Sequence, residues 1–304
     1  MTTRVILDTD IGTDVDDCLA LALILCAPEL ELVGVTCVYG DVLLRARMVL
    51  KFLKLRGRTD VPVMVGATRP LLDLQPIYWL GHEGKGLLDD ADEALAPSPE
   101  HAVDFIVRTV MEDPGQIHLI TIGPMTNAAL AFLREPCLAQ NLAHLTVMGS
   151  VLRGPANLHL PYSEHNVRCD AEAAHVVLSA GAPTTLIPLD VTEQVKIYAK
   201  DVARIRARGT PFHEAVADQV DVYPYFHPRG YTYLHDPLAV ATLIRPDLVT
   251  TRALHVDVET AGRHTAGVTL MRVPSEEASA NAQVALAVDV QGFEEFLVHR
   301  LAEA

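Results

Sequence analysis

Residues 5–17 of the chain read VILDTDIGTDVDD, a short apolar run followed by five aspartates within ten residues. Residues 5–7 predict a buried strand, and the apolar stretch at 18–27 predicts a helix. The acidic residues between them are Asp8, Asp10, Asp14, Asp16 and Asp17. They therefore lie at the carboxyl end of a first strand and the start of a first helix. In open α/β sheets, this crevice is where ligands bind.

Carboxylates packed this closely repel one another, and they need a cation or raised pKa values to stay together. A set of ligands that are all oxygen suits a hard cation, calcium or magnesium, better than zinc. Single residues have a structural alternative: Asp16 and Asp17 could be first-turn residues favoured by the helix dipole, and Asp8 could cap a turn. Five aspartates at one junction favour a metal site.

The composition restricts the possible classes of function. Half of the 304 residues are hydrophobic, which provides a large core, and we expect one domain over residues 1–304. A net charge of −15 without a basic block excludes nucleic acid and anionic membranes as main partners. Five scattered cysteines without a CxxC pair, no signal peptide and no apolar run of about 18 residues predict a cytoplasmic protein.

Strand-like and helix-like segments alternate over the first two-thirds of the chain. We expect strands at 31–38, 61–65, 116–122, 143–148 and 184–189, and helices at 42–55, 99–112, 124–134 and 170–180. The helix at 99–112 is expected to open with Ser98 as its cap and Pro99 at its first position. Repeated βα units predict an open, mostly parallel, doubly wound sheet.

The pattern changes after Asp190. Helical segments dominate from 196 to 244 as a helical excursion, and a C-terminal β-hairpin is expected from 252–259 and 264–273. A strand at 282–288 and a helix at 292–302 end the chain.

Several metal and phosphate motifs fail at defined positions. The haloacid dehalogenase opening needs Thr or Val where Gly12 stands, and an EF-hand loop starting at Asp8 has Gly12 and Leu19 at ligand positions. A phosphate loop around Gly84-Lys85 lacks its first glycine, because Trp79 stands there.

Four further clusters fall at predicted strand ends or helix starts: Gly123–Asn127 (GPMTN), Asn157 with Glu164-His165-Asn166, His235-Asp236-Pro237, and the glycine-rich loop Gly81–Gly86. If the second cluster is extended, Glu164 and Asn166 point the same way and suit a polyhydroxylated ligand such as a sugar. Asp236 could instead cap a helix that starts at Pro237, and the glycine-rich loop could be a mobile lid.

Together these clusters resemble, in order and over the whole chain, the inosine–uridine-preferring nucleoside hydrolases. The resemblance implies an open α/β sheet with a helical region, one bound Ca²⁺ ion, and a dimer or tetramer by analogy. It implies the calcium ligands Asp10, Asp17, the carbonyl of Thr126 and Asp236. Asp10 is also the implied base for the attacking water.

The resemblance implies ribose contacts from Asp16, Asn157, Glu164 and Asn166. It places His235 and His82 near the leaving base. His235 is the first candidate for the acid that protonates the base, since a histidine pKa can lie near neutrality.

Two departures from the family pattern stand out. The common opening is Asp-x-Asp-Pro-Gly-x-Asp-Asp, whereas this chain has two extra residues, so Asp14 is interpreted as a loop residue or outer partner. Asp41 stands where many members carry a sugar-binding Asn. It could contact the ribose, or it could pair with Arg45 one turn on.

The aromatic residues of the segment 223–233 are expected to read the base by stacking and hydrogen bonds, with about half of them packed in the core instead. Replacements at Tyr225, His227 and Tyr231 are expected to change base preference.

The predicted activity is calcium-dependent hydrolysis of the N-glycosidic bond of a nucleoside, which releases ribose and a free base. A metal-dependent phosphohydrolase and a non-catalytic calcium-dependent nucleoside- or sugar-binding protein remain as alternatives. Purine or pyrimidine preference is left open.

Overall fold

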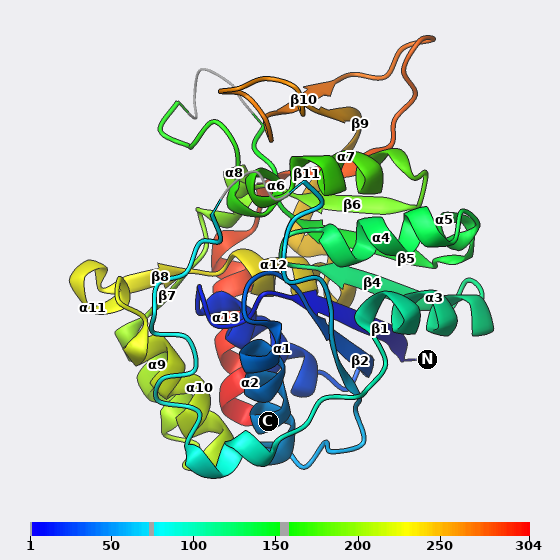
Figure 1. The fold of residues 1–304 in the computed structure, drawn as a ribbon. Helices are drawn as coiled ribbons and strands as arrows, with labels where there is room; N and C mark the ends of the chain where they lie inside the picture. The colour runs from blue at the N-terminus through cyan, green and yellow to red at the C-terminus, as the bar shows by residue number, and fades with distance from the viewer. Residues whose placement is uncertain (1, 73–75, 153–157) are drawn as a thin grey trace.

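A computed structural model describes residues 2–72, 76–152 and 158–304, and Asn157 therefore lies outside the described residues. In the described chain the central sheet has the strand order β10-β9-β11-β6-β5-β4-β1-β2-β3 (Figure 1). From β3 to β11 neighbouring strands pair in parallel, whereas β9 and β10 are antiparallel. The strands are β1 (Thr3–Thr9), β2 (Leu30–Cys37), β3 (Val63–Val65), β4 (Ile117–Thr121), β5 (His144–Met148), β6 (Thr184–Ile187), β9 (Val249–Val258), β10 (Thr269–Arg272) and β11 (Ala282–Val288).

Side chains alternate across β1 and supply two cores, one on each face of the sheet. Val5 and Leu7 pack in one core, and Ile6 packs in the other. The first core is covered by α1 (Asp16–Leu25), α2 (Val42–Leu55), α10 (Pro211–Val222), α12 (His235–Ile244) and α13 (Val290–Glu303). The second is covered by α3 (Ala102–Glu112), α4 (Thr126–Arg134), α5 (Leu138–Asn141) and α7 (Ala171–Ser179).

The direction of winding reverses between β1 and β4. The chain proceeds from β1 to β2 and β3 on one side, and then places β4, β5 and β6 on the other side of β1. The carboxyl ends of β1 and β4 therefore flank the topological switch point, where open α/β sheets bind ligands. The expected open, mostly parallel, doubly wound sheet is confirmed, as is the antiparallel β9–β10 hairpin.

The excursion at 196–244 is less uniformly helical than expected. Between α9 (Ala199–Arg206), α10 and α11 (Phe226–Arg229), the structure forms a second small sheet from β7 (Lys196–Tyr198) and β8 (Tyr231–Tyr233). Strands of three residues are too short to produce a readable alternation. Figure 1 shows α9 and α10 outside the sheet, beside α13.

One helix start and two short elements also differ from expectation. The helix expected from Pro99 starts at Ala102 with His101 as its cap, because Ser98 instead bridges to Met64 beside β3. The acidic stretch at 90–94 is a short 3₁₀ helix, η1 (Asp90–Ala94). The remaining elements are α6 (His165–Cys169), α8 (Leu189–Thr192) and η3 (Pro246–Leu248).

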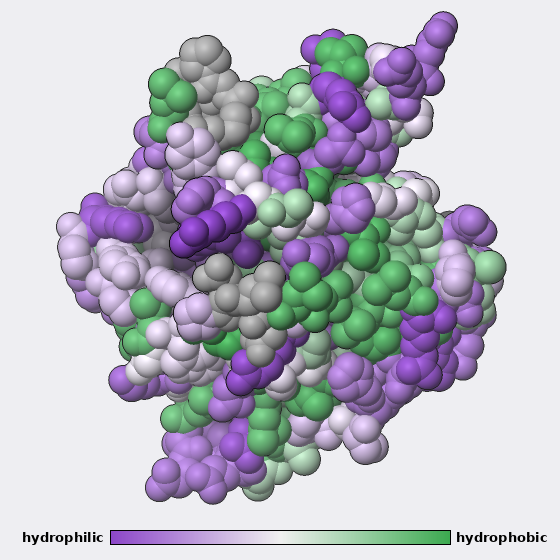
Figure 2. All heavy atoms as spheres, turned by 45° about the horizontal axis from the view of Figure 1, so that its top comes forward, coloured by the Kyte–Doolittle hydropathy of each residue, from purple (hydrophilic) through white to green (hydrophobic). Residues whose placement is uncertain are grey.

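The surface is mixed in character. Figure 2 shows hydrophilic residues over much of the face drawn there, with hydrophobic residues in several separate patches between them. Among the helices of the described chain, none has the length and apolar character needed to cross a membrane.

Candidate active site

A cavity of about 400 Å³ opens at the switch point. Its walls come from the loop after β1, the ends of β4 and β5, and the starts of α1, α6 and α12. The polar and charged side chains that line it are those of Asp10, Thr13, Asp14, Asp16, Asp17, Tyr78, Ser163, Glu164, His165, Asn166, Arg168, Tyr223, His235 and Asp236.

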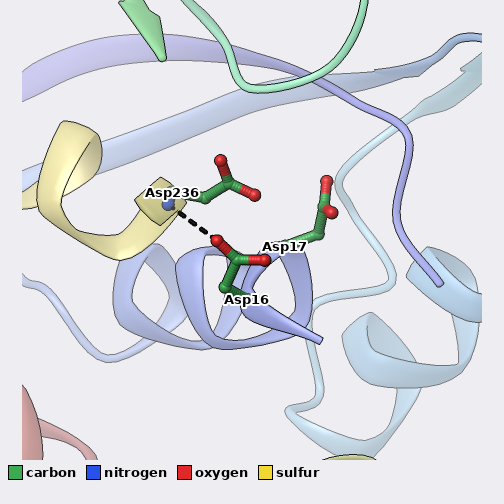
Figure 3. A group of neighbouring side chains, drawn as sticks. All are labelled: Asp16, Asp17 and Asp236. Atoms are coloured by element: carbon green, nitrogen blue, oxygen red, sulfur yellow. Dashed lines mark hydrogen bonds between the residues drawn. The ribbon is translucent and has the colours of Figure 1, made fainter. Parts of the chain in front are cut away.

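Three buried carboxylates form the floor of this cavity. Asp16 and Asp17 stand in the first turn of α1, and Asp236 stands in the first turn of α12. Figure 3 shows the three side chains converging, and oxygens of all three lie within 4.8 Å of one another. The backbone N–H of Asp236 donates to Oδ2 of Asp16 at 3.0 Å, which ties the two helix starts together. Asp236 is thus inside α12, which rules out the alternative that it caps a helix starting at Pro237.

The electrostatics of this group fit a hard cation. Burial raises the pKa of Asp16, Asp17 and Asp236 well above the ordinary range, and each neighbouring carboxylate raises it further. The Thr9 hydroxyl donates to Asp17 at 2.5 Å and favours its ionised form. A divalent ion would neutralise these charges and accept their oxygens as ligands, and oxygen-only sites suit calcium or magnesium.

Asp10 reaches the same cavity from the end of β1, outside the group of three. Its carboxylate packs against Gly123, where an added Cβ would lie 2.7 Å from Oδ1 of Asp10. The glycine of the GPMTN turn is therefore required by the close approach of the loop after β1, and the turn's Asn127 has a different task. Asn127 donates to Oδ1 of Asp8 at 2.8 Å, beneath the cavity.

Glu164 and Asn166 line the cavity, but the segment that carries them is not extended. Glu164 caps α6 and accepts hydrogen bonds from the backbone N–H groups of Ser150, Asn166 and Val167. The Asn166 side chain donates to the carbonyl of Ile122 at 2.8 Å, so it joins α6 to the end of β4. The two side chains reach the cavity together because Glu164 caps α6 and Asn166 lies in its first turn, not because they alternate along a strand.

The comparisons with known proteins agree with this geometry. The family model described as inosine-uridine preferring nucleoside hydrolase matches residues 5–295. The chain belongs to this family. The pyrimidine-specific ribonucleoside hydrolase RihA of Citrobacter koseri is 36% identical, with 99% of each chain covered, and RihA of Salmonella schwarzengrund is 35% identical with the same coverage.

Solved nucleoside hydrolases share the fold. The purine-preferring ribonucleoside hydrolase from Gardnerella vaginalis is 31% identical, with a TM-score of 0.88 over 99% of this chain and 98% of that chain. The plant nucleoside hydrolase PpNRh1 is 26% identical, with a TM-score of 0.87 and full coverage of both chains. The chain is thus a nucleoside hydrolase by family and by fold.

His235 lines the cavity, but its protonation differs from the expectation. Its Nδ1 lies 2.7 Å from the hydroxyl of Thr192, and its ring packs at 5.3 Å from that of Tyr233. Burial lowers the pKa of His235 to about 4. In this nucleoside hydrolase His235 is therefore neutral at pH 7, which corrects the argument that its pKa lies near neutrality. It can still donate or accept a hydrogen bond.

Sequence reasoning missed the pair formed by Asp14 and Tyr223. The Tyr223 hydroxyl donates to Oδ2 of Asp14 at 2.9 Å, and both residues line the cavity. The ring of His82 lies 6.0 Å from that of Tyr223, so His82 stands behind the tyrosine rather than on the cavity wall. Tyr223 belongs to the aromatic segment already noted, but nothing in the sequence separates it from its neighbours.

His165 was also missed as a lining residue, although it stands between Glu164 and Asn166. Its ring contacts Tyr39 and Tyr78 edge-on, and its Nε2 lies 3.5 Å from the thiol of Cys169. Burial lowers its pKa, but the thiol and nearby carboxylates outweigh burial and bring the pKa to about 9. The imidazole therefore adds a positive charge to the cavity wall.

Other expected residues do not reach the cavity. Thr126 is the first residue of α4, its carbonyl is directed along that helix, and its hydroxyl donates to Asp170 at 2.6 Å. Asp41 is exposed and caps α2 by accepting from the N–H of Leu44 at 3.0 Å. The side chain of Arg45 does not pair with that of Asp41, since it is turned toward the loop after β1.

The three aromatic-segment residues singled out above lie away from the cavity wall. Tyr225 is 39% exposed and packs edge-on against Tyr223. His227 is exposed and lies 3.9 Å from Asp221. Tyr231 packs on Tyr233 in the small sheet, with Lys196 over its ring. Of these aromatic-segment residues only Tyr223 lines the cavity, and the effect of Tyr225, His227 and Tyr231 on base preference stays a prediction.

Proposed function

We propose that this nucleoside hydrolase cleaves the N-glycosidic bond of ribonucleosides with calcium as its cofactor, releasing ribose and a free base. The observation that carries the proposal is the convergence of three buried carboxylates, from Asp16, Asp17 and Asp236, at the switch-point cavity. Burial and mutual repulsion disfavour the ionised forms of these three carboxylates unless a cation lies between them.

The metal ligands are assigned to the side chains of Asp10, Asp17 and Asp236. The backbone carbonyl of Thr126 is retained as the fourth proposed ligand on the family resemblance alone, since Thr126 is not among the residues that line the cavity. Bound calcium would orient the ribose diol and lower the pKa of the attacking water. Asp10 then accepts the proton of that water, because its carboxylate faces the cavity. The carboxylate of Asp8, in contrast, accepts hydrogen bonds from Thr36 and Asn127 beneath the cavity.

The sugar is held by Asp16, Glu164 and Asn166, whose side chains line one cavity from two helix starts. A glycosidic bond breaks through a transition state with positive charge on the sugar ring. Fixed carboxylates around that ring stabilise the charge without reorganising. The acidity of the cavity thus serves both metal and sugar.

The leaving base is met by Tyr223 and His235 at the wall formed by α10 and α12. A neutral His235 donates or accepts a hydrogen bond rather than transferring a proton to the base, since its pKa is lowered to about 4. Tyr223 donates to Asp14, so its oxygen keeps a lone pair for a donor on the base.

The test is a panel of uridine, cytidine, inosine and adenosine with the matching 5′-monophosphates, assayed for free ribose and for free phosphate. Ribose release that stops on metal stripping and returns with calcium is the expected result. Phosphate release from the monophosphates would favour the phosphohydrolase. Binding without either product would favour the sugar- or nucleoside-binding protein. Both purines and pyrimidines are included because the related enzymes named above include both preferences.

The remaining proposals rest on family analogy. The chain acts as one domain, in the cytoplasm, as a dimer or tetramer. Light scattering on the purified protein measures the oligomeric state directly.

A further inference from the structure

Arg45, in the first turn of α2, has the largest side chain among the fully buried residues of the described chain. It lies behind the carboxylate cavity, and none of the roles assigned above uses it. A guanidinium cannot lose its proton in a protein, so its burial requires hydrogen bonds or opposite charge on every side.

The loop after β1, which lines the cavity, and the loop after β2 supply these partners. Nε donates to the carbonyl of Tyr39 at 2.7 Å. Nη1 donates to the carbonyl of Ile11 at 2.7 Å and to that of Asp10, and Nη2 donates to the Thr13 hydroxyl at 2.9 Å. One side chain therefore holds three residues of the loop after β1, Asp10, Ile11 and Thr13, and ties them to Tyr39 in the loop after β2.

This backbone cannot hold its shape through regular hydrogen bonding. Gly12 has a φ of +114°, and Tyr39 has a φ of +67°, which is uncommon for a residue with a side chain. The loop also packs tightly on α2, because a Cβ on Gly12 would lie 2.8 Å from Sδ of Met48. Strained loops persist only where the surroundings over-determine them, and Arg45 supplies the donors that the buried carbonyls need.

Asp10 connects the contacts of Arg45 to the proposed reaction. Its carbonyl accepts from Arg45, its carboxylate faces the cavity, and Oδ2 lies 4.0 Å from Nη2 of Arg45. Within the described ranges, no other ion pair involves the five-aspartate run. The contacts of Arg45 thus set where the Asp10 carboxylate stands.

We propose that Arg45 is a positioning residue that preforms the calcium site and aims Asp10 at the attacking water. It does so by holding the loop 10–13, the loop that carries the two extra residues of this chain. The proposal rests on the calcium-dependent hydrolysis proposed above and deepens it.

The test compares Arg45→Lys with Arg47→Lys as a matched control. Lysine keeps the charge, but one ammonium cannot replace the planar fork that reaches three carbonyls and a hydroxyl. Arg47 stands on the same helix and donates instead to the carbonyl of Glu93, away from the cavity. The fluorescence of Trp79, the single tryptophan, checks the local fold, since the Arg45 guanidinium lies 5.0 Å from its ring.

Calorimetric titration of the metal-stripped proteins should show calcium dissociation constants raised by about 10- to 100-fold for Arg45→Lys, as for other groups that orient metal ligands. At saturating calcium, kcat should fall by about tenfold or more while KM changes less, because Asp10 acts in the transition state. Arg47→Lys should match the wild type in all three quantities.

A folded Arg45→Lys protein with wild-type calcium affinity and kcat, and only a lower Tm, would overturn the proposal, since that is what a purely structural role predicts. If Arg45→Lys does not fold, Thr13→Ala decides, because it removes one of the four contacts. A calcium dissociation constant raised by a smaller factor supports the proposal, and an unchanged constant overturns it. A wild-type protein that neither binds calcium nor releases ribose would contradict the proposed function itself. A failure of the Arg45 proposal is different, because it appears only in the comparison of the variants with an active wild type.

Discussion

The acidic run after β1 and the aromatic segment at 223–233 are both rich in candidate side chains, but they differ in how many of these side chains line the cavity. Four of the five aspartates line it. Of the aromatic segment, Tyr223 lines it, whereas Tyr225 and Tyr231 pack elsewhere. A strand end and a helix start fix the direction of each residue between them. A segment of short turns has no such periodic constraint, so its side chains are directed by packing that the sequence does not express.

The acidic run nevertheless contains one member with another task. Asp8 accepts from Thr36 and Asn127, under the cavity rather than in it, and burial raises its pKa to about 7. Asp8 joins β1, β2 and α4, whereas Asp10 lines the cavity. The two regions therefore differ in the fraction of their side chains that line the cavity, and mutations can measure the effect of that difference.

The largest effect is expected at Asp10. Asp10→Asn removes the acceptor for the water proton and should reduce kcat by at least ~10²-fold, since loss of a general base typically costs that much. Stopped assays of ribose release measure it, with Asp60→Asn as a control, because Asp60 is an exposed partner of Arg58 only. Turnover within a few fold of wild type in folded Asp10→Asn would assign the base elsewhere.

The next effect concerns the aromatic segment. Tyr223→Phe removes the hydroxyl bound to Asp14 and should reduce kcat/KM by about tenfold, the value of one hydrogen bond to a charged group. Tyr231→Phe, the matched change outside the cavity, should leave kcat/KM unchanged. Steady-state kinetics with uridine and inosine compare the two. Equal losses in kcat/KM would mean that the segment moves as a unit. The direction of each side chain, toward or away from the cavity, would then not determine its role.

Sequence reasoning succeeded where local backbone geometry determines position. The alternation in β1, the junction into α1 and the glycine of the GPMTN turn are local features, so the switch-point cavity and most of its carboxylates were predictable. The assignment of the Thr126 carbonyl as a ligand stays a prediction from the family resemblance, because Thr126 starts α4 and is not among the residues that line the cavity. Asp41, Tyr223 and the protonation of His235 depend on contacts between distant segments and on burial, neither of which a single sequence reveals.

The charge of the floor predicts a pH dependence. Burial raises the folded-state pKa of Asp16, Asp17 and Asp236 above the unfolded value, and that of Asp8 to about 7. For metal-free protein, this contributes stability that is fully present below about pH 4 and is lost as the pH rises through the folded pKa values. Calcium must displace these protons to bind.

The increase in Tm on adding calcium should therefore grow between pH 5 and pH 8. Each proton displaced changes the stability by about 1.4 kcal/mol per pH unit. Thermal unfolding with excess calcium and with chelator, at unit steps of pH, measures the difference. A constant difference would show that the carboxylates are ionised without metal, contrary to their burial.

The smallest effect separates sugar binding from helix capping at Asp41. Its Oδ1 accepts from the N–H of Leu44, and its side chain is exposed, so Asp41→Ala should lower the free energy of unfolding by about 0.5–2 kcal/mol, the usual cost of losing a cap. Asp41→Asn keeps an acceptor at the same place and should lose less. Urea unfolding measures both. Neither variant should change KM for uridine or for its 2′- and 3′-deoxy analogues, because Asp41 lies outside the cavity. A selective rise in KM for ribonucleosides that differs between the two variants would instead place Asp41 against the sugar, and the cavity would then have to close over α2 during turnover.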